Sequence, residues 1–304
     1  MARKTGGDIR IGISGWRYAP WRGVFYPKEL RQKDELGFAS HRFRSIEING
    51  TFYSAQRPTT FERWVRETAE DFVFAVKGPR YITHIRRLQE AEAPLANFFA
   101  SGLFRLGAKL GPILWQLPPN FRYDRSVIEP FLALLPHDTR AAEKLAARND
   151  GRIKTMALEA DAERPLRHAL EIRHDSFVDE DFVALLRAHR VALVCADTVD
   201  WPRLMDLTAD FAYCRLHGSE QLYASGYDAP SLDRWADWID AWAHGREAAG
   251  PGVKRILDKD APRQAKRDVY VYFDNDIKVR APFDADGLAE RLGVAARDQP
   301  RAAE

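Results

Sequence analysis

The strongest constraint on the fold is a series of eight short apolar runs, each followed by a helix-like or linking segment. The runs have the spacing of buried β-strands and comprise residues 9–14, 44–49, 72–77, 113–117, 168–173, 191–196, 211–216 and 269–273. Strands that alternate with helices pair in parallel, because a parallel pair needs a long crossover connection. Eight such units favour an α/β fold that closes into a (β/α)8 TIM barrel over an open doubly wound sheet.

We predict one TIM-barrel domain over residues 1–304, with its core at about 9–293. A TIM barrel typically needs about 250 residues, so a chain of 304 is long enough. The segment at about 140–165 departs from the strand–helix rhythm, because it is charged and contains the turn signal Asn149-Asp150-Gly151. We interpret it as an insertion before the fifth strand, on the outside or bottom of the barrel.

Helical spacing is predicted over residues 28–43, 60–70, 94–110, 126–135, 179–190 and 285–292. Thr and Ser are residue types that cap helices, so we expect Thr59 to cap the second of these and Ser231 to cap a further helix. In that further helix Trp235, Trp238 and Trp242 recur at i, i+3 and i+7. This spacing favours docking of the helix on a core over binding of a ligand.

The composition excludes several classes of protein. The formal net charge is only +2, so no general attraction to nucleic acid or membranes is encoded. Cys195 and Cys214 lie inside strand-like runs without a disulfide framework, which fits a reducing compartment. The N-terminal residues lack the apolar stretch of a signal peptide, and no run approaches the roughly 18 apolar residues of a membrane span. We therefore predict a cytoplasmic protein with no membrane partner.

Polar residues gather at one end of the predicted barrel. Alternate residues of a barrel strand face the interior, and the helix-facing set should be large and apolar, so residue size predicts the orientation of each strand. The residues predicted to face inward are Gly12, Ser14, Trp16, Glu47, Asn49, Ala75, Lys77, Gln116, Glu171, Arg173, Asp197, Arg215, His217, Phe273 and Asn275. The polar ones lie at the C-terminal ends of their strands, where barrel enzymes build active sites. We therefore predict a functional site at this end.

A structural ion network is the alternative explanation for the charged members of this set. It would comprise Glu47, Lys77, Glu171, Arg173, Asp197 and Arg215. Because a buried ion network stabilises a protein poorly in comparison with apolar packing, we favour a ligand site, with part of the set serving the network.

Several longer motifs resemble those of one known family. They are residues 15–18 through Trp21 and 25–27, residues 47–53, residues 74–77 with Thr83-His84, residues 111–119, residues 171–174, residues 215–218 and residues 272–276. Together these motifs resemble the YecE-like family, known as domain of unknown function 72, and they cover most of the chain except 140–165. The resemblance implies a TIM-barrel fold and brings no established reaction.

The leading hypothesis is an enzyme, a hydrolase or isomerase, that binds a small anionic, ring-bearing substrate such as a sugar phosphate or a nucleotide-like group without a cofactor. Arg and Lys can hold a phosphate, and Glu47 and Glu171 lie on different strands, so they could serve as general acid and base. His217 is an alternative base. The predicted substrate-binding residues are Trp16, Tyr18, Asn49, Tyr53, Lys77, Gln116, Arg173, Asp197, Arg215 and Asn275, with Tyr223 a further candidate for stacking on a ring.

A metal-dependent isomerase or nuclease-like barrel is a second hypothesis. Its ligands would be Glu47, Glu171, Asp197 and His217 or His174, which are ligand types for divalent cations. No close His pair marks such a site, and Arg173 and Arg215 would oppose a cation. We therefore predict no metal.

A non-catalytic binder of nucleic acid or another polyanion is a third hypothesis. It depends on the basic link at residues 250–267, which carries three lysines and three arginines between Lys254 and Arg267. Asp258 and Asp260 interrupt this run, so a solvated loop is the favoured interpretation.

Overall fold

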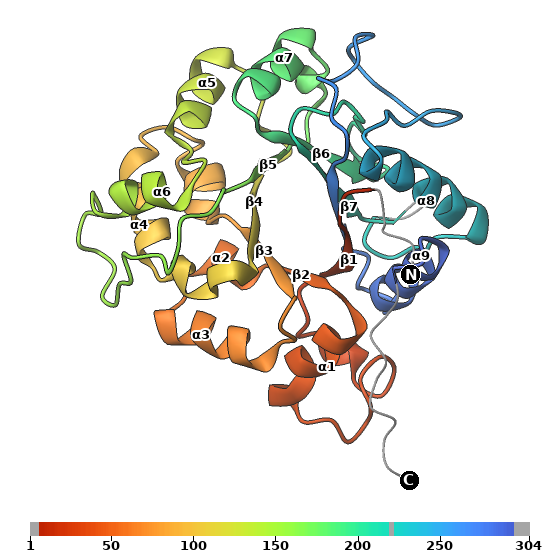
Figure 1. The fold of residues 1–304 in the computed structure, drawn as a ribbon, viewed down its shortest axis with the longest axis horizontal. Helices are drawn as coiled ribbons and strands as arrows, with labels where there is room; N and C mark the ends of the chain where they lie inside the picture. Colours follow the sequence, from red (N-terminus) through yellow and green to blue (C-terminus); the bar gives the residue numbers. More distant parts are fainter. Residues whose placement is uncertain (1–5, 219–221, 295–304) are drawn as a thin grey trace.

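Within residues 6–218 and 222–294, the part of the chain that the computed structural model describes, eight parallel strands close into a barrel (Figure 1). Each strand pairs with the next along the chain, and β8 pairs with β1. The strands are β1 (Ile9–Ser14), β2 (Ser45–Ile48), β3 (Val73–Lys77), β4 (Leu110–Gln116), β5 (His168–Glu171), β6 (Ala192–Asp197), β7 (Phe211–Leu216) and β8 (Asp268–Phe273). The predicted α/β TIM barrel is confirmed.

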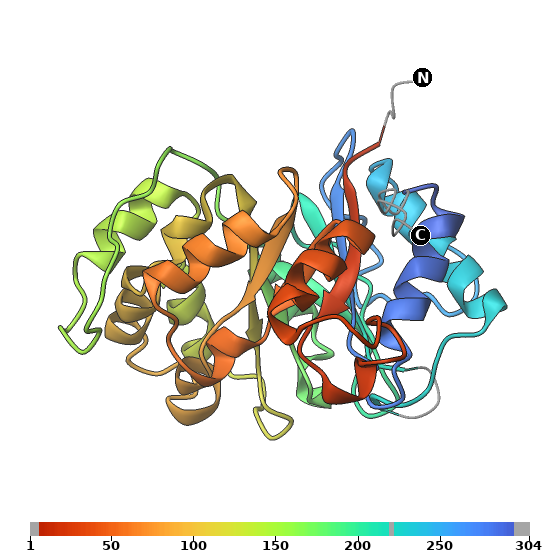
Figure 2. The ribbon, with the colours of Figure 1, turned by 90° about the horizontal axis from the view of Figure 1, so that it is seen from below.

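Helices surround the barrel, as Figures 1 and 2 show. They are α1 (Glu35–Arg42), α2 (Gly50–Tyr53), α3 (Pro58–Glu67), α4 (Glu92–Ala100), α5 (Arg125–Leu134), α6 (Thr139–Ala146), α7 (Glu180–Ala188), α8 (Ala229–Ala243) and α9 (Ala281–Arg291). Shorter 3-10 helices span Ala19–Trp21, Gln32–Asp34, Leu103–Lys109 and Asp175–Phe177, and a π-helical turn spans Tyr81–Ile85. Among the described residues, no helix combines the length and apolar character that a membrane crossing requires.

Two predicted helix caps are wrong. Helix α3 begins at Pro58, whose fixed φ suits a first helical turn, so Thr59 lies inside the helix. Helix α8 is capped by Asp228, whose side chain accepts a hydrogen bond from the backbone N of Ser231 at 2.9 Å. The cap therefore precedes Ser231 by one turn, because an aspartate ahead of a proline-containing first turn satisfies the free backbone N–H group.

The predicted helix over residues 94–110 is two separate elements. Helix α4 ends at Ala100, and Gly102 then adopts φ of 109°, a left-handed conformation that ends the helix before the 3-10 helix Leu103–Lys109. Residues 50–53, directly after β2, form the one-turn helix α2.

The tryptophans of α8 dock this helix on the core, as predicted. Trp235, Trp238 and Trp242 are all buried, and the rings of Trp235 and Trp238 pack edge to face with centroids 5.2 Å apart.

Residues 140–165 lie on the outside of the barrel, where α6 packs beside α4 (Figure 1). Arg148 pairs with Glu92 of α4 at 2.6 Å, and the backbone N of Ala157 donates to the carbonyl of Ala100 at 3.0 Å. Arg152 and Ile153 reach the C-terminal end of the barrel, where they line a hollow described below.

The barrel interior is filled by a separate apolar cluster that explains the inward-facing positions. Its members come from β3 to β8 and are Ala75, Leu114, Ala169, Ala192, Val194, Ala196, Phe211, Tyr213, Tyr270 and Tyr272. Because side chains alternate along a strand, residues two positions further on also face inward. This places Lys77, Gln116, Glu171 and Arg215 at the C-terminal end of the interior, in agreement with the prediction.

Candidate active site

The centre of the C-terminal end of the barrel is the guanidinium group of Arg215, whose side chain is 1% exposed. Its Nε and Nη2 donate to the two carboxylate oxygens of Glu47 at 3.1 and 2.9 Å, and its Nη1 donates to Glu171 Oε2 at 2.6 Å. Nη2 also donates to Ser14 Oγ at 3.1 Å and to Asp274 Oδ2 at 2.8 Å. Arg215 thus ties together the ends of β1, β2, β5, β7 and β8.

The strand register brings these groups to one level. Ser14 lies opposite Glu47 in the pairing of β1 with β2, and Gln116 lies opposite Glu171 in the pairing of β4 with β5. Gln116 is buried at the barrel interior, where it lies beside the carboxylate layer. Burial opposes ionisation of Arg215, but the surrounding carboxylates outweigh it and raise its pKa well above the usual value.

Both oxygens of the Glu47 carboxylate are already engaged. Ser14 Oγ donates to Oε1 at 2.5 Å and the hydroxyl of Tyr213 donates to Oε2 at 2.6 Å, in addition to the two bonds from Arg215. Asn49, the second polar residue on this strand face, donates from Nδ2 to Ser14 Oγ at 3.0 Å. Glu47 is therefore held as a hydrogen-bond acceptor, which suits a group that positions Arg215.

Glu171 bridges Arg215 to a second arginine. Arg173 Nε donates to Glu171 Oε1 at 2.7 Å, and the guanidinium of Arg173 lies 4.2 Å from the centre of the Trp201 ring. Burial raises the pKa of Glu171, but the charges of Arg173 and Arg215 outweigh it and hold the pKa well below the usual range. Glu171 is therefore ionised at neutral pH.

His217 and Asp274 complete the layer. The Nδ1 atom of His217 lies 3.1 Å from Asp274 Oδ2, and its Nε2 lies 3.8 Å from Glu171 Oε1. Burial lowers the pKa of His217, so the ring is neutral near neutral pH. Burial raises the pKa of Asp274, but Arg215 and His217 hold it below the usual range, so this carboxylate is ionised as well.

Lys77 supplies a further amine next to this layer. Its Nζ lies 4.4 Å from the centre of the Phe52 ring and makes neither an ion pair nor a hydrogen bond with the described residues. Burial, together with the charge of Arg215, lowers the pKa of Lys77 to about 8. The ring of His84 packs edge-on against Phe52, and burial together with the charges of Lys77 and Arg173 lowers the pKa of His84 to about 4. The positive charges of Lys77 and Arg173 thus both act on His84 at the mouth.

Several buried polar atoms here have no hydrogen-bond partner among the described residues. They are Asn49 Oδ1, both ring nitrogens of His217 and Trp201 Nε1. Tyr223 packs edge-on against His217 and adopts φ of 60°, a strained conformation for a bulky residue. Unpaired buried polar atoms and backbone strain are costly for stability and concentrate at functional sites.

Two hollows border the mouth, and Tyr53 lies in the wall of both. The larger, of about 420 Å³, is lined by Trp16, Tyr18 and Asn49, among others. The smaller, of about 310 Å³, lies over Phe52, Pro79, Tyr81, Phe98 and the Arg152–Ile153 part of the insertion. Tyr53 is 70% exposed, while Trp16 packs edge-on against Trp64 and the Tyr18 hydroxyl donates to the carbonyl of Ser14 at 2.5 Å.

Two predicted inward orientations are wrong, on β6 and β8. Asp197 lies on the helix side, where its carboxylate accepts hydrogen bonds from Arg203 at 2.7 Å and from the indole of Trp235 at 3.3 Å. Asp197 lies on the same side of β6 as Leu193 and Cys195, which pack against the helices. The smaller residues of β6, Ala192, Val194 and Ala196, face the interior instead, where they pack in the interior apolar cluster.

On β8 the tyrosines face inward and the predicted orientation is reversed. Phe273 joins the outer core, and Asn275 donates to Asp284 of α9 at 2.7 Å and to the carbonyl of Ser225 at 2.9 Å. The large apolar side chains of β8 give no size contrast between its faces. Tyrosine faces inward because its hydroxyl finds partners there: Tyr272 bonds to Ser45 Oγ at 2.6 Å.

Reversing β8 brings in a residue that the sequence argument missed. Asp274, not Asn275, faces the centre and contacts Arg215. The signal was present, since Asp274 directly follows the strand within the motif at 272–276. Tyr213 and Trp201 were missed as well, because a buried tyrosine and a loop tryptophan look like ordinary core residues in a sequence.

The acidic residues of the layer surround a guanidinium and leave little room for a metal. Within residues 6–218 and 222–294, no group of three or more His, Cys, Asp or Glu side chains is arranged to hold a metal ion. In the basic link, Arg255 pairs with Asp260 at 2.7 Å, so part of its charge is compensated locally.

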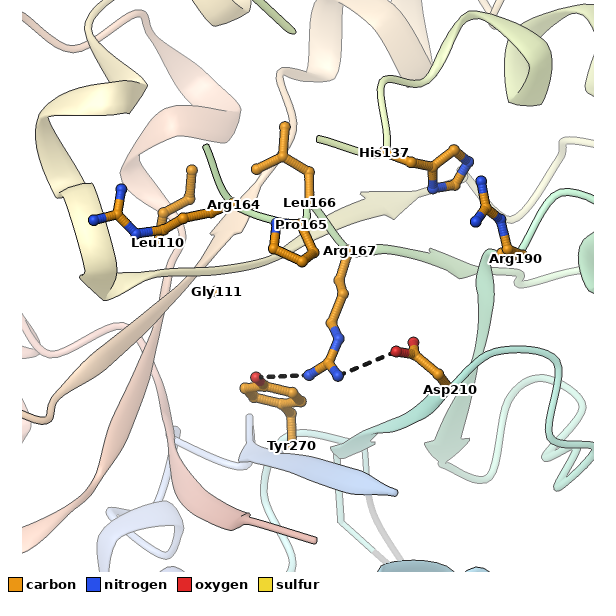
Figure 3. A pocket seen from close by; sticks show the side chains of 10 residues that line it. All are labelled: Leu110, Gly111, His137, Arg164, Pro165, Leu166, Arg167, Arg190, Asp210 and Tyr270. Atoms are coloured by element: carbon orange, nitrogen blue, oxygen red, sulfur yellow. Dashed lines mark hydrogen bonds and ion pairs between the residues drawn. The ribbon is translucent and has the colours of Figure 1, made fainter. Parts of the chain in front are cut away.

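A further hollow, of about 370 Å³, lies at the opposite, N-terminal end of the barrel (Figure 3). Arg167 reaches across it toward Tyr270 and Asp210, and it also donates to Asp268 at 2.7 Å. This guanidinium is compensated by two carboxylates. We therefore interpret Arg167 as part of a structural ion network.

Comparison with known proteins identifies the family. The sequence pattern described as "Protein of unknown function DUF72" matches residues 10–304 of this chain. The chain belongs to the DUF72 family. Among its relatives, the UPF0759 protein YunF of Bacillus subtilis is 31% identical over 118 residues, which is 37% of this chain and 41% of YunF. The UPF0759 protein YecE of Escherichia coli K12 is 30% identical over 115 residues, 37% of this chain and 39% of YecE. The matches thus span about two-fifths of these curated relatives.

Solved structures of DUF72 proteins share the fold over nearly the whole chain. A DUF72 family protein from Thermotoga maritima superposes with a TM-score of 0.69 at 22% identity, covering 94% of this chain and 99% of that one. A DUF72 family protein from Enterococcus faecalis has a TM-score of 0.66 at 15% identity, covering 97% of this chain and 100% of that one. At these identities the likeness concerns the fold alone. The predicted membership of the YecE-like family is confirmed.

Proposed function

We propose that this DUF72 protein is an enzyme that binds a small anionic, ring-bearing substrate, such as a sugar phosphate or a nucleotide-like group, at the C-terminal face of its barrel. The observation that carries the proposal is that cationic side chains and buried polar atoms without hydrogen-bond partners occur together at this face. Lys77 makes no ion pair with a described residue, and Arg173, which also acts on His84, pairs with Glu171. Buried atoms of Asn49 and Trp201 at the same end of the barrel have no hydrogen-bond partner among the described residues.

Charge and shape at the mouth both favour an anion with a ring. Burial is the largest cause of the lowered pKa of His84, and the charges of Lys77 and Arg173 lower it further. The same charges disfavour an added cation and stabilise an added anion. Trp201 and Tyr223 supply aromatic faces beside His217, and Tyr18 and Tyr53 border the larger hollow. Aromatic side chains bind the flat face of a sugar or base.

The contacts of the three predicted catalytic residues indicate different roles for them. Glu47 and Glu171 accept hydrogen bonds at both carboxylate oxygens, so we assign them to positioning Arg215 and Arg173. His217 is the better general base, because burial keeps its imidazole neutral and its Nε2 is unpartnered. A general base that is not hydrogen-bonded to a nucleophilic side chain suits isomerisation or hydrolysis.

We also propose a cytoplasmic location. Cys195 and Cys214 lie opposite each other in the pairing of β6 with β7, and both are free thiols in this structure. Adjacent free thiols fit a reducing compartment.

Titration calorimetry with inorganic phosphate and with glucose 6-phosphate tests the proposal. Arg173→Ala removes a charge-assisted contact and should weaken binding about 10- to 100-fold. Arg203→Ala is the matched control, because Arg203 also bonds a carboxylate, Asp197 at 2.7 Å, and faces a tryptophan, but on the helix side. Binding that is absent from the native protein, or equally weak in both variants, would refute an anion site at the mouth.

A further inference from the structure

The described part of the chain has two buried lysines with opposite surroundings. Lys109 Nζ donates to the carbonyls of Val65 and Thr68 at 2.8 and 3.0 Å and to Thr68 Oγ1 at 3.0 Å. All three of its hydrogens are thus used, and its role is structural. Lys77, at the C-terminal end of β3, has no such acceptors among the described residues, and its amine faces the ring of Phe52.

Charged groups from the elements that pack around Lys77 set the electrostatic environment of its amine. The charged groups are Arg215 of β7, Glu47 of β2, Glu171 of β5 and Asp274 after β8. The cation Arg173 also lies at the mouth, together with His84, whose pKa of about 4 leaves it neutral near pH 7. The three carboxylates are bonded to Arg215 rather than to Lys77. Arg215 and Arg173 together compensate two of these three negative charges.

We propose that Lys77 is a nucleophilic amine that forms a Schiff base with the aldehyde or ketone carbonyl of a small phosphorylated substrate. This inference rests on the proposed function, since it assigns a reaction to the same mouth. An amine that is desolvated, placed beside a cation and free of acceptors is the arrangement that activates lysine as a nucleophile. Arg173 holds the anionic end of the substrate while the carbonyl approaches Nζ.

The step balances without a further reactant. The neutral amine of Lys77 attacks the carbonyl carbon and forms a carbinolamine. Both hydrogens of the amine then leave with the carbonyl oxygen as one water, and a C=N bond replaces the C=O bond. When the imine is protonated, it draws electrons from the adjacent carbon, which can lose a proton to the neutral Nε2 of His217. That proton transfer is the first half of an isomerisation.

The lowered pKa of Lys77 makes the amine available near neutral pH. A group with a pKa of about 8 is neutral in about a tenth of the molecules at pH 7, whereas an ordinary lysine is neutral in about one in several thousand. Among the described residues, the absence of acceptors around the amine and its availability in the neutral form both indicate Lys77 as the nucleophile.

The experiment uses the full chain and pyridoxal 5′-phosphate, which combines an aldehyde, a ring and a phosphate. After a short exposure, borohydride reduces any imine to a stable amine, and peptide mass spectrometry locates it. Lys77 should be modified at least about tenfold faster than the exposed lysines, with a rate that rises through about pH 8. Inorganic phosphate should slow the reaction. Lys77→Arg keeps the charge and should remove this fast modification, and Lys109→Arg should not.

The outcomes separate this inference from the proposed function. If phosphate binds in an Arg173-dependent manner but Lys77 reacts no faster than surface lysines, the Schiff-base role is refuted and the anion site stands. If Lys77 reacts quickly with pyridoxal, which lacks the phosphate, and calorimetry finds no phosphate binding, the amine is activated and the anion site is refuted. Loss of the fast modification in a Lys77→Arg protein with an unchanged melting temperature supports the inference.

Discussion

Replacing Arg215 by methionine should destabilise the fold, because it removes the charge that the buried acidic layer surrounds. Methionine keeps much of the side-chain volume but none of the donors to Glu47, Glu171 and Asp274. Removing one partner of a buried ion pair typically costs about 3 to 5 kcal/mol. The entropy of unfolding is about 0.6 kcal/mol/K for a chain of 304 residues, so the loss corresponds to about 5 to 8 °C in Tm.

The pH dependence of the Tm deficit provides a second, independent test of this prediction. In the native protein the pKa of Asp274 lies below 3.8, because Arg215 outweighs the effect of burial, so its stabilisation is present above that pH and is lost as the pH falls. Without Arg215, burial dominates and raises the pKa of Asp274 above 3.8. The variant then gains stability relative to the native protein as the pH falls, and the Tm deficit should shrink between pH 7 and pH 5.

Differential scanning calorimetry at several pH values measures both effects. A double variant, Glu47→Gln with Arg215→Met, should recover part of the lost Tm, because one unpaired charge is removed. Arg167→Met at the other end of the barrel is the control and should cost less, since that side chain is 26% exposed. A deficit below about 2 °C, or one that is equal at pH 7 and pH 5, would contradict the electrostatic account.

Three further substitutions test the fold and the limits of the site. A Cβ at Gly12 would lie 1.8 Å from the carbonyl oxygen of Ser45, so Gly12→Ala should lower the Tm or prevent folding, whereas Gly50→Ala should be tolerated. Asp228→Ala should cost about 1 kcal/mol in urea unfolding through loss of the α8 cap, and a smaller loss than in Ser231→Ala would contradict the cap assignment. Asp197→Asn should lower the Tm through its bond with Arg203 and leave phosphate affinity in calorimetry unchanged; a fall in affinity would return Asp197 to the site.

Much of the architecture could be predicted from local pattern alone. Eight apolar runs separated by helical segments leave few folds, because parallel strands need crossovers and a closed barrel removes both edges. The orientation of β2 was also predictable, since Ile46 and Ile48 contrast with Glu47 and Asn49. Contrast between the two faces of a strand is what makes orientation readable from sequence.

Where that contrast is missing, orientation cannot be predicted from the pattern of a strand alone. β6 and β8 carry apolar residues on both faces, so their orientation depends on packing across the barrel interior and on hydroxyl partners such as Ser45 of β2. The same holds for the chemistry of the mouth. Strand periodicity alone was enough to predict that Glu47, Glu171, Lys77 and Arg215 would meet at one end of a barrel. Which carboxylates bind Arg215, and that Lys77 is left without one, depends on side-chain distances that only the closed barrel sets.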